Sequence, residues 1–181
     1  DINDDDLKNI DCVVHLAALS NDPIGQFNTK ITYDINYKGT IKLARAAKKM
    51  GTKNFIFVSS QSIYGISKKD EYLDEYKSKK NPVTAYAKSK MMSEKYLNKI
   101  KSKNFKVTFL RPSTVFGASP RIRTDIILNN FLLNAYYNKK ISIISDGLPW
   151  RPIVHIEDLY NEIKKLIDNN YKNINGKAFN I

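Results

Sequence analysis

Three apolar runs punctuate the chain, at residues 12–19, 54–60 and 105–113. Each run is continuous rather than alternating, which is typical of strands buried on both faces of a parallel sheet. Residues 29–51 repeat apolar positions near helical spacing, with Gly51 as the expected C-cap, and a second helix is expected at about 85–101. The order strand, helix, strand, helix, strand predicts an α/β fold with a doubly wound, Rossmann-like parallel sheet.

Shorter elements follow from about residue 118. The expected elements are a helix at 123–138, a short strand at 140–144, a turn at 145–149, an amphipathic helix at 155–170 and a closing strand at 177–181. Pro112 is expected to end the third strand, because proline cannot donate a main-chain hydrogen bond to a neighbouring strand.

Composition limits the function classes without selecting one. The 181 residues suffice for one sizeable core, and no apolar run approaches the length of about 20 residues that spans a bilayer. The acidic start at 1–10 does not fit a signal peptide, so a cytoplasmic location is the default expectation. The net charge is +12, but the lysines are spread over the whole chain among acids, which favours a solvated surface over a specific nucleic-acid interface. An anionic small ligand is compatible with this charge.

Cysteine and histidine offer little chemistry. Cys12 is the only cysteine, which excludes an intramolecular disulfide and a cysteine-built metal site. His15 and His155 lie far apart in the sequence, so no metal site is expected. His15 belongs to a predicted buried strand and is expected to be a hydrogen-bonded core histidine.

Tyr86 and Lys90 form the first candidate for catalysis. A free tyrosine has a pKa of about 10 and is a poor base at neutral pH. Residues four apart share one face of a helix, so the Lys90 ammonium can favour the Tyr86 phenolate by Coulomb attraction. The spacing alone also occurs by chance in many helices, and its position after residues 57–65 is what favours an active site.

A glycine-rich phosphate turn is absent from the sequence. Such a turn normally follows the first strand of a dinucleotide-binding domain, because only glycine lets the main chain approach a pyrophosphate. The seven glycines include no G-x-G or G-x-x-G cluster. Either the chain binds no dinucleotide, or it begins after that turn.

Several segments together resemble the extended short-chain dehydrogenase/reductase family, in particular its nucleotide-sugar epimerase and dehydratase branch. The matching segments, in family order, are DIND (1–4), HLAA (15–18), NYKGT (36–40), FVSSQSIYG (57–65), YAKSK (86–90), LRPSTVFG (110–117) and DGLPWRPIVHIEDL (146–159). The resemblance covers the whole chain. It implies an internal fragment that lacks the first two strands and the glycine-rich turn.

The resemblance implies a role for each matching residue. The implied catalytic residues are Ser60, Tyr86, Lys90 and Asn36, of which Asn36 supports the lysine through water. The implied cofactor-binding residues are Asp1, Ile2, Leu16, Ala17, Ala18, Ser59, Tyr86, Lys90 and Pro112. The implied substrate-binding residues are Ser60, Gln61, Thr114, Arg121, Asn129, Asn130 and Arg151. Arg123 either joins them or pairs with a nearby acid.

The implied reaction is NAD-dependent epimerisation of a nucleoside-diphosphate sugar through a transient keto sugar, with NADP not excluded. Family dehydratases place an Asp-Glu pair after the active-site serine or threonine, whereas Gln61 and Ser62 stand here. Dehydration is therefore disfavoured. The alternatives left open are a keto-sugar reductase, a 4,6-dehydratase and a non-catalytic dinucleotide-binding protein of the same fold.

The resemblance also implies an organisation and an assembly. Residues 1–117 are expected to form part of the dinucleotide-binding region with the catalytic residues. Residues 118–181 are expected to form part of the sugar-binding region, interleaved with the end of the Rossmann sheet. A homodimer is an expectation because helices at the sheet edge often pair in this family.

Overall fold

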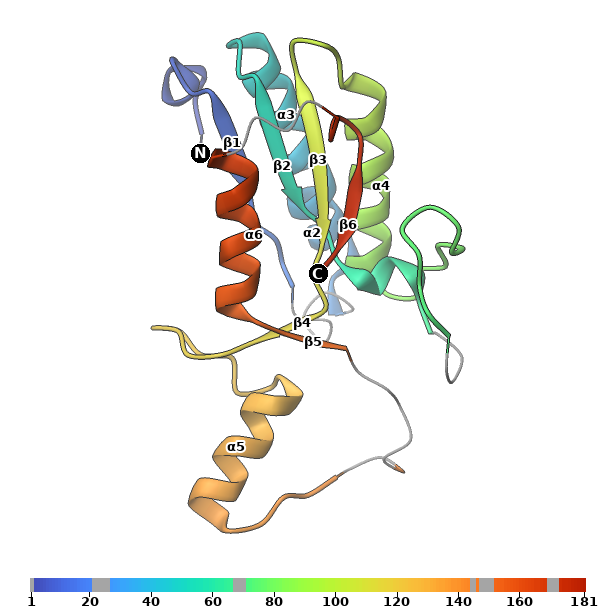
Figure 1. The fold of residues 1–181 in the computed structure, drawn as a ribbon, viewed down its shortest axis with the longest axis vertical. Helices are drawn as coiled ribbons and strands as arrows, with labels where there is room; N and C mark the ends of the chain where they lie inside the picture. Colours follow the sequence, from blue (N-terminus) through green and yellow to red (C-terminus); the bar gives the residue numbers. More distant parts are fainter. Residues whose placement is uncertain (1, 21–26, 67–70, 144–145, 147–151, 169–172) are drawn as a thin grey trace.

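The computed structural model describes residues 2–20, 27–66, 71–143, 146, 152–168 and 173–181 (Figure 1). A four-stranded sheet forms its centre, with strand order β1-β2-β3-β6 and every neighbouring pair parallel. The strands are β1 (Cys12–His15), β2 (Asn54–Val58), β3 (Lys106–Arg111) and β6 (Ala178–Asn180). This confirms the predicted α/β fold with a parallel sheet.

Helices cover both faces of the sheet, as a doubly wound fold requires. One face packs against α3 (Thr40–Lys49) and α4 (Ala85–Ile100), and the other packs against α6 (Ile156–Asp168) (Figure 1). Side chains alternate along the strands, so Phe55 and Phe57 join the core under α3 and α4, while Ile56 joins the core under α6. The continuous apolar runs therefore reflect burial on both faces.

The helical stretch predicted at 29–51 contains three segments. They are α2 (Thr29–Tyr33), a π-helical segment η2 (Asp34–Gly39) and α3. Gly51 follows α3 with a φ of +86°, while the amides of Gly51 and Thr52 donate to the carbonyls of Lys48 and Ala47. This pattern is a Schellman cap, which glycine favours because it has no Cβ, so the predicted end of the helix is confirmed.

The first turns of α4 lie at the edge of the sheet where β2 ends. The Thr84 hydroxyl accepts a hydrogen bond of 3.1 Å from the amide of Ala87, which caps the first turn. A short 3₁₀ helix, η3 (Gln61–Tyr64), lies between β2 and α4 in sequence and contacts α4 in space. In open α/β sheets, ligands bind outside the carboxyl ends of the strands, so both elements occupy the expected position for a site.

The first apolar run is a shorter strand than predicted. Residues 12–19 were expected to be strand, but β1 ends at His15, and Leu16 is 55% exposed. The main-chain amide and carbonyl of Leu19 bond to the side chain of Asn36 instead of to a neighbouring strand. The second half of the run thus leaves the sheet because a side chain takes the place of the sheet hydrogen bonds.

Several elements between β3 and α6 differ from the prediction. Helix α5 (Ile127–Asn138) begins four residues after the predicted start at 123. The predicted strand at 140–144 was wrong for its described residues 140–143, whose Ile141 and Ile143 are 50% and 59% exposed. A second, two-stranded sheet of β4 (Thr114–Phe116) and β5 (Ile153–His155) was not predicted, because three-residue strands are too short to carry a pattern.

Helix α6 and the closing strand agree with the prediction except at their first and last residues. The predicted helix at 155–170 corresponds to Ile156–Asp168, and the predicted strand at 177–181 corresponds to Ala178–Asn180. Within the described segments, no helix is both long and apolar enough to cross a membrane.

Phe55 provides a test of the core under α3 and α4. Its ring is fully buried and lies 5.8 Å from the ring of Phe105, measured between centroids. Phe55→Ala is expected to lower the free energy of unfolding by about 3–5 kcal/mol, because the cavity cannot fully collapse. Phe27→Ala is the matched control, since Phe27 is 94% exposed, and it should change that free energy by less than about 0.5 kcal/mol. Urea unfolding measures both, and equal effects would contradict this core.

Candidate active site

Lys90 lies at the centre of the candidate site, between α4 and the end of β2. Its side chain is 2% exposed, and its ammonium donates a hydrogen bond of 2.7 Å to the main-chain carbonyl of Val58. The ammonium also lies 4.7 Å from the centroid of the Phe57 ring, within the range of a cation–π interaction. An ammonium has three N–H donors, and the Val58 carbonyl uses one of them. The others can donate to a ligand.

The environment of Lys90 makes its charge costly but does not remove it. Burial lowers the pKa of Lys90 to about 8, and the nearby Glu94 carboxylate opposes this effect. The ammonium form therefore still predominates at pH 7. A charge kept in a buried position is a feature of functional sites.

Tyr86 lies one turn before Lys90 on the same face of α4, as the spacing predicted. The Lys90 ammonium is 5.8 Å from the centroid of the Tyr86 ring, and the Tyr86 side chain is half-buried. A cation at this separation favours the ionised form of a phenol. The Lys90 ammonium and the Tyr86 ring thus lie close together where α4 meets the end of β2.

Ser60 is held at the junction of β2 and η3. It is the N-cap of η3, and its hydroxyl oxygen accepts a 3.1 Å hydrogen bond from the amide of Ser62. Its hydroxyl lies 3.0 Å from the Ser62 hydroxyl oxygen. Ser60 follows Val58 by two residues, so the acceptor of the Lys90 bond and the Ser60 hydroxyl belong to one short segment.

Asn36 is buried in the π-helical segment and binds two parts of the site. Its side-chain oxygen accepts from the amide of Leu19 at 2.8 Å, and its side-chain nitrogen donates to the Leu19 carbonyl at 3.0 Å and to the Ser89 hydroxyl at 3.3 Å. Its main-chain carbonyl accepts from Thr40 and Ser93. Asn36 therefore ties the segment after β1 to α4, and a water-mediated contact with Lys90 stays a prediction.

Five of the residues expected to contact a cofactor follow the ends of three strands. Leu16 and Ala17 are exposed, and Ala18 is half-buried, all directly after β1. Ser59 and Pro112 follow β2 and β3, and the Ser59 hydroxyl is buried without a hydrogen-bond partner. The spare ammonium hydrogens of Lys90, the half-buried phenol of Tyr86 and the orphaned Ser59 hydroxyl suit a ligand with hydroxyl groups, such as a ribose.

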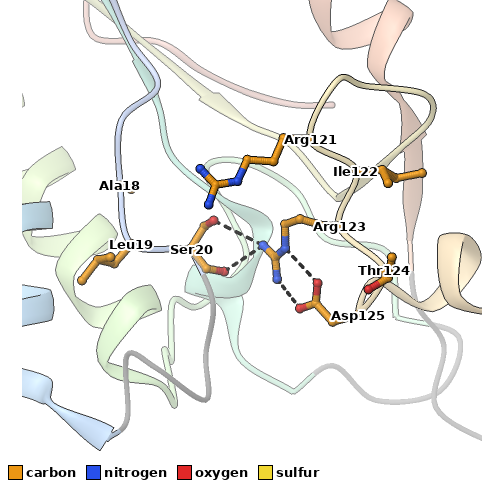
Figure 2. Close-up of a pocket in the computed structure, with 8 residues that line it drawn as sticks. All are labelled: Ala18, Leu19, Ser20, Arg121, Ile122, Arg123, Thr124 and Asp125. Atoms are coloured by element: carbon orange, nitrogen blue, oxygen red, sulfur yellow. Dashed lines mark hydrogen bonds and ion pairs between the residues drawn. The ribbon is translucent and has the colours of Figure 1, made fainter.

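A cavity of about 620 Å³ opens beside this segment. Its lining comes from two loops and comprises Ala18, Leu19, Ser20, Arg121, Ile122, Arg123, Thr124 and Asp125. Figure 2 shows the Arg121 side chain extending toward the segment after β1, whereas Ile122 points away from it. Arg121, predicted to bind substrate, thus shares a cavity with Ala18, which was predicted to bind cofactor.

Arg123 forms an ion pair, which was one of the two alternatives for it. Its guanidinium donates to the Asp125 carboxylate at 2.6 and 3.0 Å and to Ser20 at 3.3 Å (Figure 2). The Arg123 guanidinium lowers the pKa of Asp125 through these hydrogen bonds. Asn129 and Asn130 donate to the carbonyls of Arg123 and Thr124, so they anchor this loop to α5.

The remaining predicted residues are placed as follows. Gln61 donates from its side chain to the carbonyl of Ile181 at 3.1 Å. Thr114 begins β4, and its amide donates to the carbonyl of Pro152. Ile2 is 55% exposed near the start of the chain. Asp1 and Arg151 lie outside the described residues.

The described segments contain no group of three or more histidine, cysteine or acidic side chains that could hold a metal ion.

His15 is a hydrogen-bonded core residue, as expected. Its Nε2 atom lies 2.9 Å from the hydroxyl oxygen of Thr40, and that hydroxyl donates to the carbonyl of Asn36. Because the single Thr40 hydrogen is used, His15 Nε2 is the donor, which fixes the neutral tautomer. Burial, followed by repulsion from Lys90, lowers the pKa of His15 to about 4.

An ion pair missed by the sequence interpretation lies next to the site. Glu94 and Arg111 are buried and joined by hydrogen bonds of 2.7 and 2.9 Å. A signal was present, because Glu94 follows Lys90 by four residues and so shares the helix face that is buried. Arg111 ends β3, which is buried from Val107 onward, and a buried strand is an unusual place for a charge.

Comparison with known proteins gives one family for this chain. The family model described as "NAD dependent epimerase/dehydratase family" matches residues 4–181. The N-acetyl-alpha-D-glucosaminyl-diphospho-ditrans,octacis-undecaprenol 4-epimerase of Escherichia coli O157:H7 is 30% identical over 169 residues, which cover 92% of this chain and 48% of that protein. The dTDP-D-glucose 4,6-dehydratase of Mus musculus is 29% identical over 178 residues, or 97% of this chain and 48% of that protein.

A solved structure agrees with these sequence matches. A mutant of the UDP-glucuronic acid 4-epimerase from Bacillus cereus, in complex with UDP-4-deoxy-4-fluoro-glucuronic acid and NAD, matches with a TM-score of 0.85 and 26% identity. The match covers 98% of this chain and 55% of that one. The chain spans about half the length of the curated relatives it matches.

The His15 environment predicts a specific acid sensitivity. The folded pKa of about 4 lies below the ordinary value of 6.5, so between these values the unfolded state binds a proton that the folded state does not. Stability present above pH 6.5 is therefore lost as the pH falls, by about 3 kcal/mol at pH 4. His15→Gln keeps a donor to Thr40 and should show a smaller loss between pH 7 and pH 4.5 in urea unfolding. Equal losses in both proteins would contradict this environment.

Proposed function

The chain belongs to the NAD dependent epimerase/dehydratase family, and from that premise we propose that it carries the catalytic residues of an NAD-dependent epimerase acting on a nucleoside-diphosphate sugar. The observation that carries the proposal is the position of the Lys90 ammonium, bound to the Val58 carbonyl and 5.8 Å from the Tyr86 ring centroid. Ser60 lies two residues beyond that carbonyl. These three side chains form the proposed catalytic set.

Tyr86 is the proposed general base. The Lys90 ammonium stabilises the phenolate, so Tyr86 can take the proton from a sugar hydroxyl at neutral pH. In the reverse step Tyr86 returns this proton to the keto oxygen. An epimer results when the keto sugar rotates in the site between the two steps, so that the hydride returns to its opposite face.

Ser60 is proposed to hydrogen-bond the same sugar oxygen. Its hydroxyl oxygen is held by the Ser62 amide, while its hydrogen can rotate from Ser62 to the substrate. A donor at this oxygen stabilises the negative charge that develops there. Asn36 is proposed to maintain the geometry by holding Leu19 and Ser89 together.

NAD⁺, when bound, supplies the hydride acceptor. We propose that Lys90 and Tyr86 bind its nicotinamide ribose, with Ser59 and Pro112 lining the same pocket. Leu16, Ala17 and Ala18 would bound the cofactor on the β1 side, with Asp1 and Ile2 near its adenine. NADP stays open as an alternative.

The substrate diphosphate is proposed to lie on the Arg121 side of the site. The guanidinium fork suits a phosphate, and Arg121 lines the cavity that Figure 2 shows. Arg151 is a second proposed phosphate ligand. The remaining proposed contacts to the sugar nucleotide are Gln61, Thr114, Asn129 and Asn130.

Epimerisation is favoured over dehydration at this site. Removing water from a sugar needs an additional acid and base, but Gln61 is an amide bound to the Ile181 carbonyl, and Ser62 is engaged with Ser60. A keto-sugar reductase would use the same three residues and would consume external reduced cofactor. A reductase would therefore cause net oxidation of that cofactor. An epimerase would not, because it regenerates the cofactor that it keeps bound.

Wider features of the proposal rest on the family resemblance. Residues 1–117 are proposed to form part of the cofactor-binding and catalytic region, and residues 118–181 part of the sugar-binding region, interleaved with the end of the Rossmann sheet through α6 and β6. A cytoplasmic location, a homodimer and the lack of a specific nucleic-acid partner stay predictions.

Substitution of Tyr86 tests the proposed function. In the full-length protein, Tyr86→Phe should lower the epimerisation rate by at least about 10²-fold, because the general base is lost. Proton NMR follows a panel of nucleoside-diphosphate hexoses, and a polyprenyl-diphosphate N-acetylhexosamine represents the substrate class of the E. coli relative. The control is Tyr96→Phe on the same helix, where the hydroxyl binds Arg45 and should not affect the rate.

The outcomes separate the alternatives. An epimer that forms with the wild type and the control, but not with Tyr86→Phe, supports the proposal. Epimer formation at the wild-type rate in Tyr86→Phe would refute the role of Tyr86. Reduction of a keto sugar with net loss of reduced cofactor would favour the reductase.

A further inference from the structure

The Glu94–Arg111 ion pair joins the helix that carries Tyr86 and Lys90 to the central sheet. Glu94 lies on α4 and Arg111 ends β3, and their side chains are 7% and 2% exposed. The guanidinium donates two hydrogen bonds to the two carboxylate oxygens, at 2.7 and 2.9 Å. This two-point contact fixes both distance and orientation, which a single hydrogen bond does not.

Arg111 extends the contact to the elements around the site. Its guanidinium also donates to the hydroxyl of Tyr64 at 2.8 Å and to the carbonyl of Glu75 at 3.1 Å. The Tyr64 hydroxyl in turn donates to the side-chain oxygen of Asn180 at 2.8 Å. Because Tyr64 ends the η3 helix that Ser60 caps, one buried network spans α4, β3, β6 and the segment that carries Ser60.

Glu94 is also the acid that acts on Lys90. The two residues lie one turn apart on α4, and the Glu94 carboxylate favours the charged form of Lys90 against the effect of burial. Other charged groups belong to the same network: the Arg111 guanidinium binds Glu94, and the Glu75 carboxylate accepts from the Asn180 amide and acts on Tyr64. His15 faces Lys90 from β1 in its neutral form, and Lys80 faces the ion pair from the loop before α4.

We propose that Glu94 and Arg111 are positioning residues, which hold α4 in register on the sheet and keep the Lys90 ammonium charged beside Tyr86. This inference rests on the proposed function, in which Lys90 acts on Tyr86. A need for stability alone does not explain the pair, because apolar side chains of similar volume commonly replace buried ion pairs without loss of stability. A fixed carboxylate next to a buried ammonium is what an apolar pair cannot supply.

Titration of Lys90 by NMR tests the proposal without any substrate. Lysine labelled with ¹³C at Cε is incorporated into the full-length protein, and the Lys90 signal is assigned by its loss in Lys90→Arg. The midpoint should lie near pH 8 in the wild type. In Glu94→Gln it should fall by about one pH unit, because the carboxylate is lost while the Arg111 charge remains. The control Glu162→Gln removes a carboxylate from an exposed ion pair on α6 and should not move the midpoint.

A double variant separates positioning from stability. Glu94→Leu/Arg111→Met removes both charges, and it serves also if Glu94→Gln fails to fold. We expect it to remain folded, with a Lys90 midpoint between those of the wild type and Glu94→Gln. Its kcat should fall with KM unchanged, whereas a merely structural pair would leave kcat intact in a folded variant.

The pH profile of the reaction supplies the functional readout. The alkaline limb of kcat should move down in Glu94→Gln with the Lys90 midpoint, which makes kcat about fivefold lower at pH 8 for a shift of one unit. An unchanged Lys90 midpoint in Glu94→Gln and the double variant would overturn the inference. Lack of epimerisation by the wild type would refute the proposed function instead, while the Lys90 midpoints would still decide the role of the pair.

Discussion

The Lys90 ammonium is buried where β2 ends, and a buried charge is tolerated only when its surroundings compensate the lost hydration. Here the compensation comes from the Val58 carbonyl at 2.7 Å, the face of the Phe57 ring and the Glu94 carboxylate one turn away. Each of these groups belongs to the strand or helix whose packing makes the core. The charge that the proposed chemistry needs is therefore held by the same contacts that hold the fold.

The parallel sheet makes this arrangement feasible by bringing the strand ends together. The main-chain amide of Ser59 donates to the Leu110 carbonyl, and that of Gln61 donates to the Pro112 carbonyl. The segments after β2 and β3 therefore remain paired beyond the strands. Two buried polar networks then attach the flanking elements. Asn36 connects the segment after β1 to α4, and Arg111 connects α4 to β3 and η3. Fully paired networks of this kind rigidify a site, because any broken contact leaves a buried polar group unsatisfied.

The sequence predicted the features that depend on local spacing. Burial of β2 and β3, the helix containing Tyr86 and Lys90 and the cap at Gly51 all follow from residues close together in the chain. The placement of Ser60 depended on the family resemblance, because nothing local identifies its partners. Features set by distant residues were missed, namely the early end of β1, the β4–β5 sheet and the Glu94–Arg111 pair. Charged residues in a lysine-rich sequence are normally interpreted as surface residues, so the helix spacing of Glu94 was a weak signal and its pairing with Arg111 follows only from the packing of the helix on the strand.

Ionisation of Tyr86 tests most directly whether the buried ammonium activates the tyrosine. The full-length protein with NAD⁺ would be titrated by ultraviolet difference spectroscopy, and the Tyr86→Phe spectrum subtracted to isolate the one phenol. The account predicts a Tyr86 pKa well below the ordinary value of about 10, and its return to at least 10 in Lys90→Met. A Tyr86 pKa near 10 that is the same with and without the Lys90 charge would contradict it.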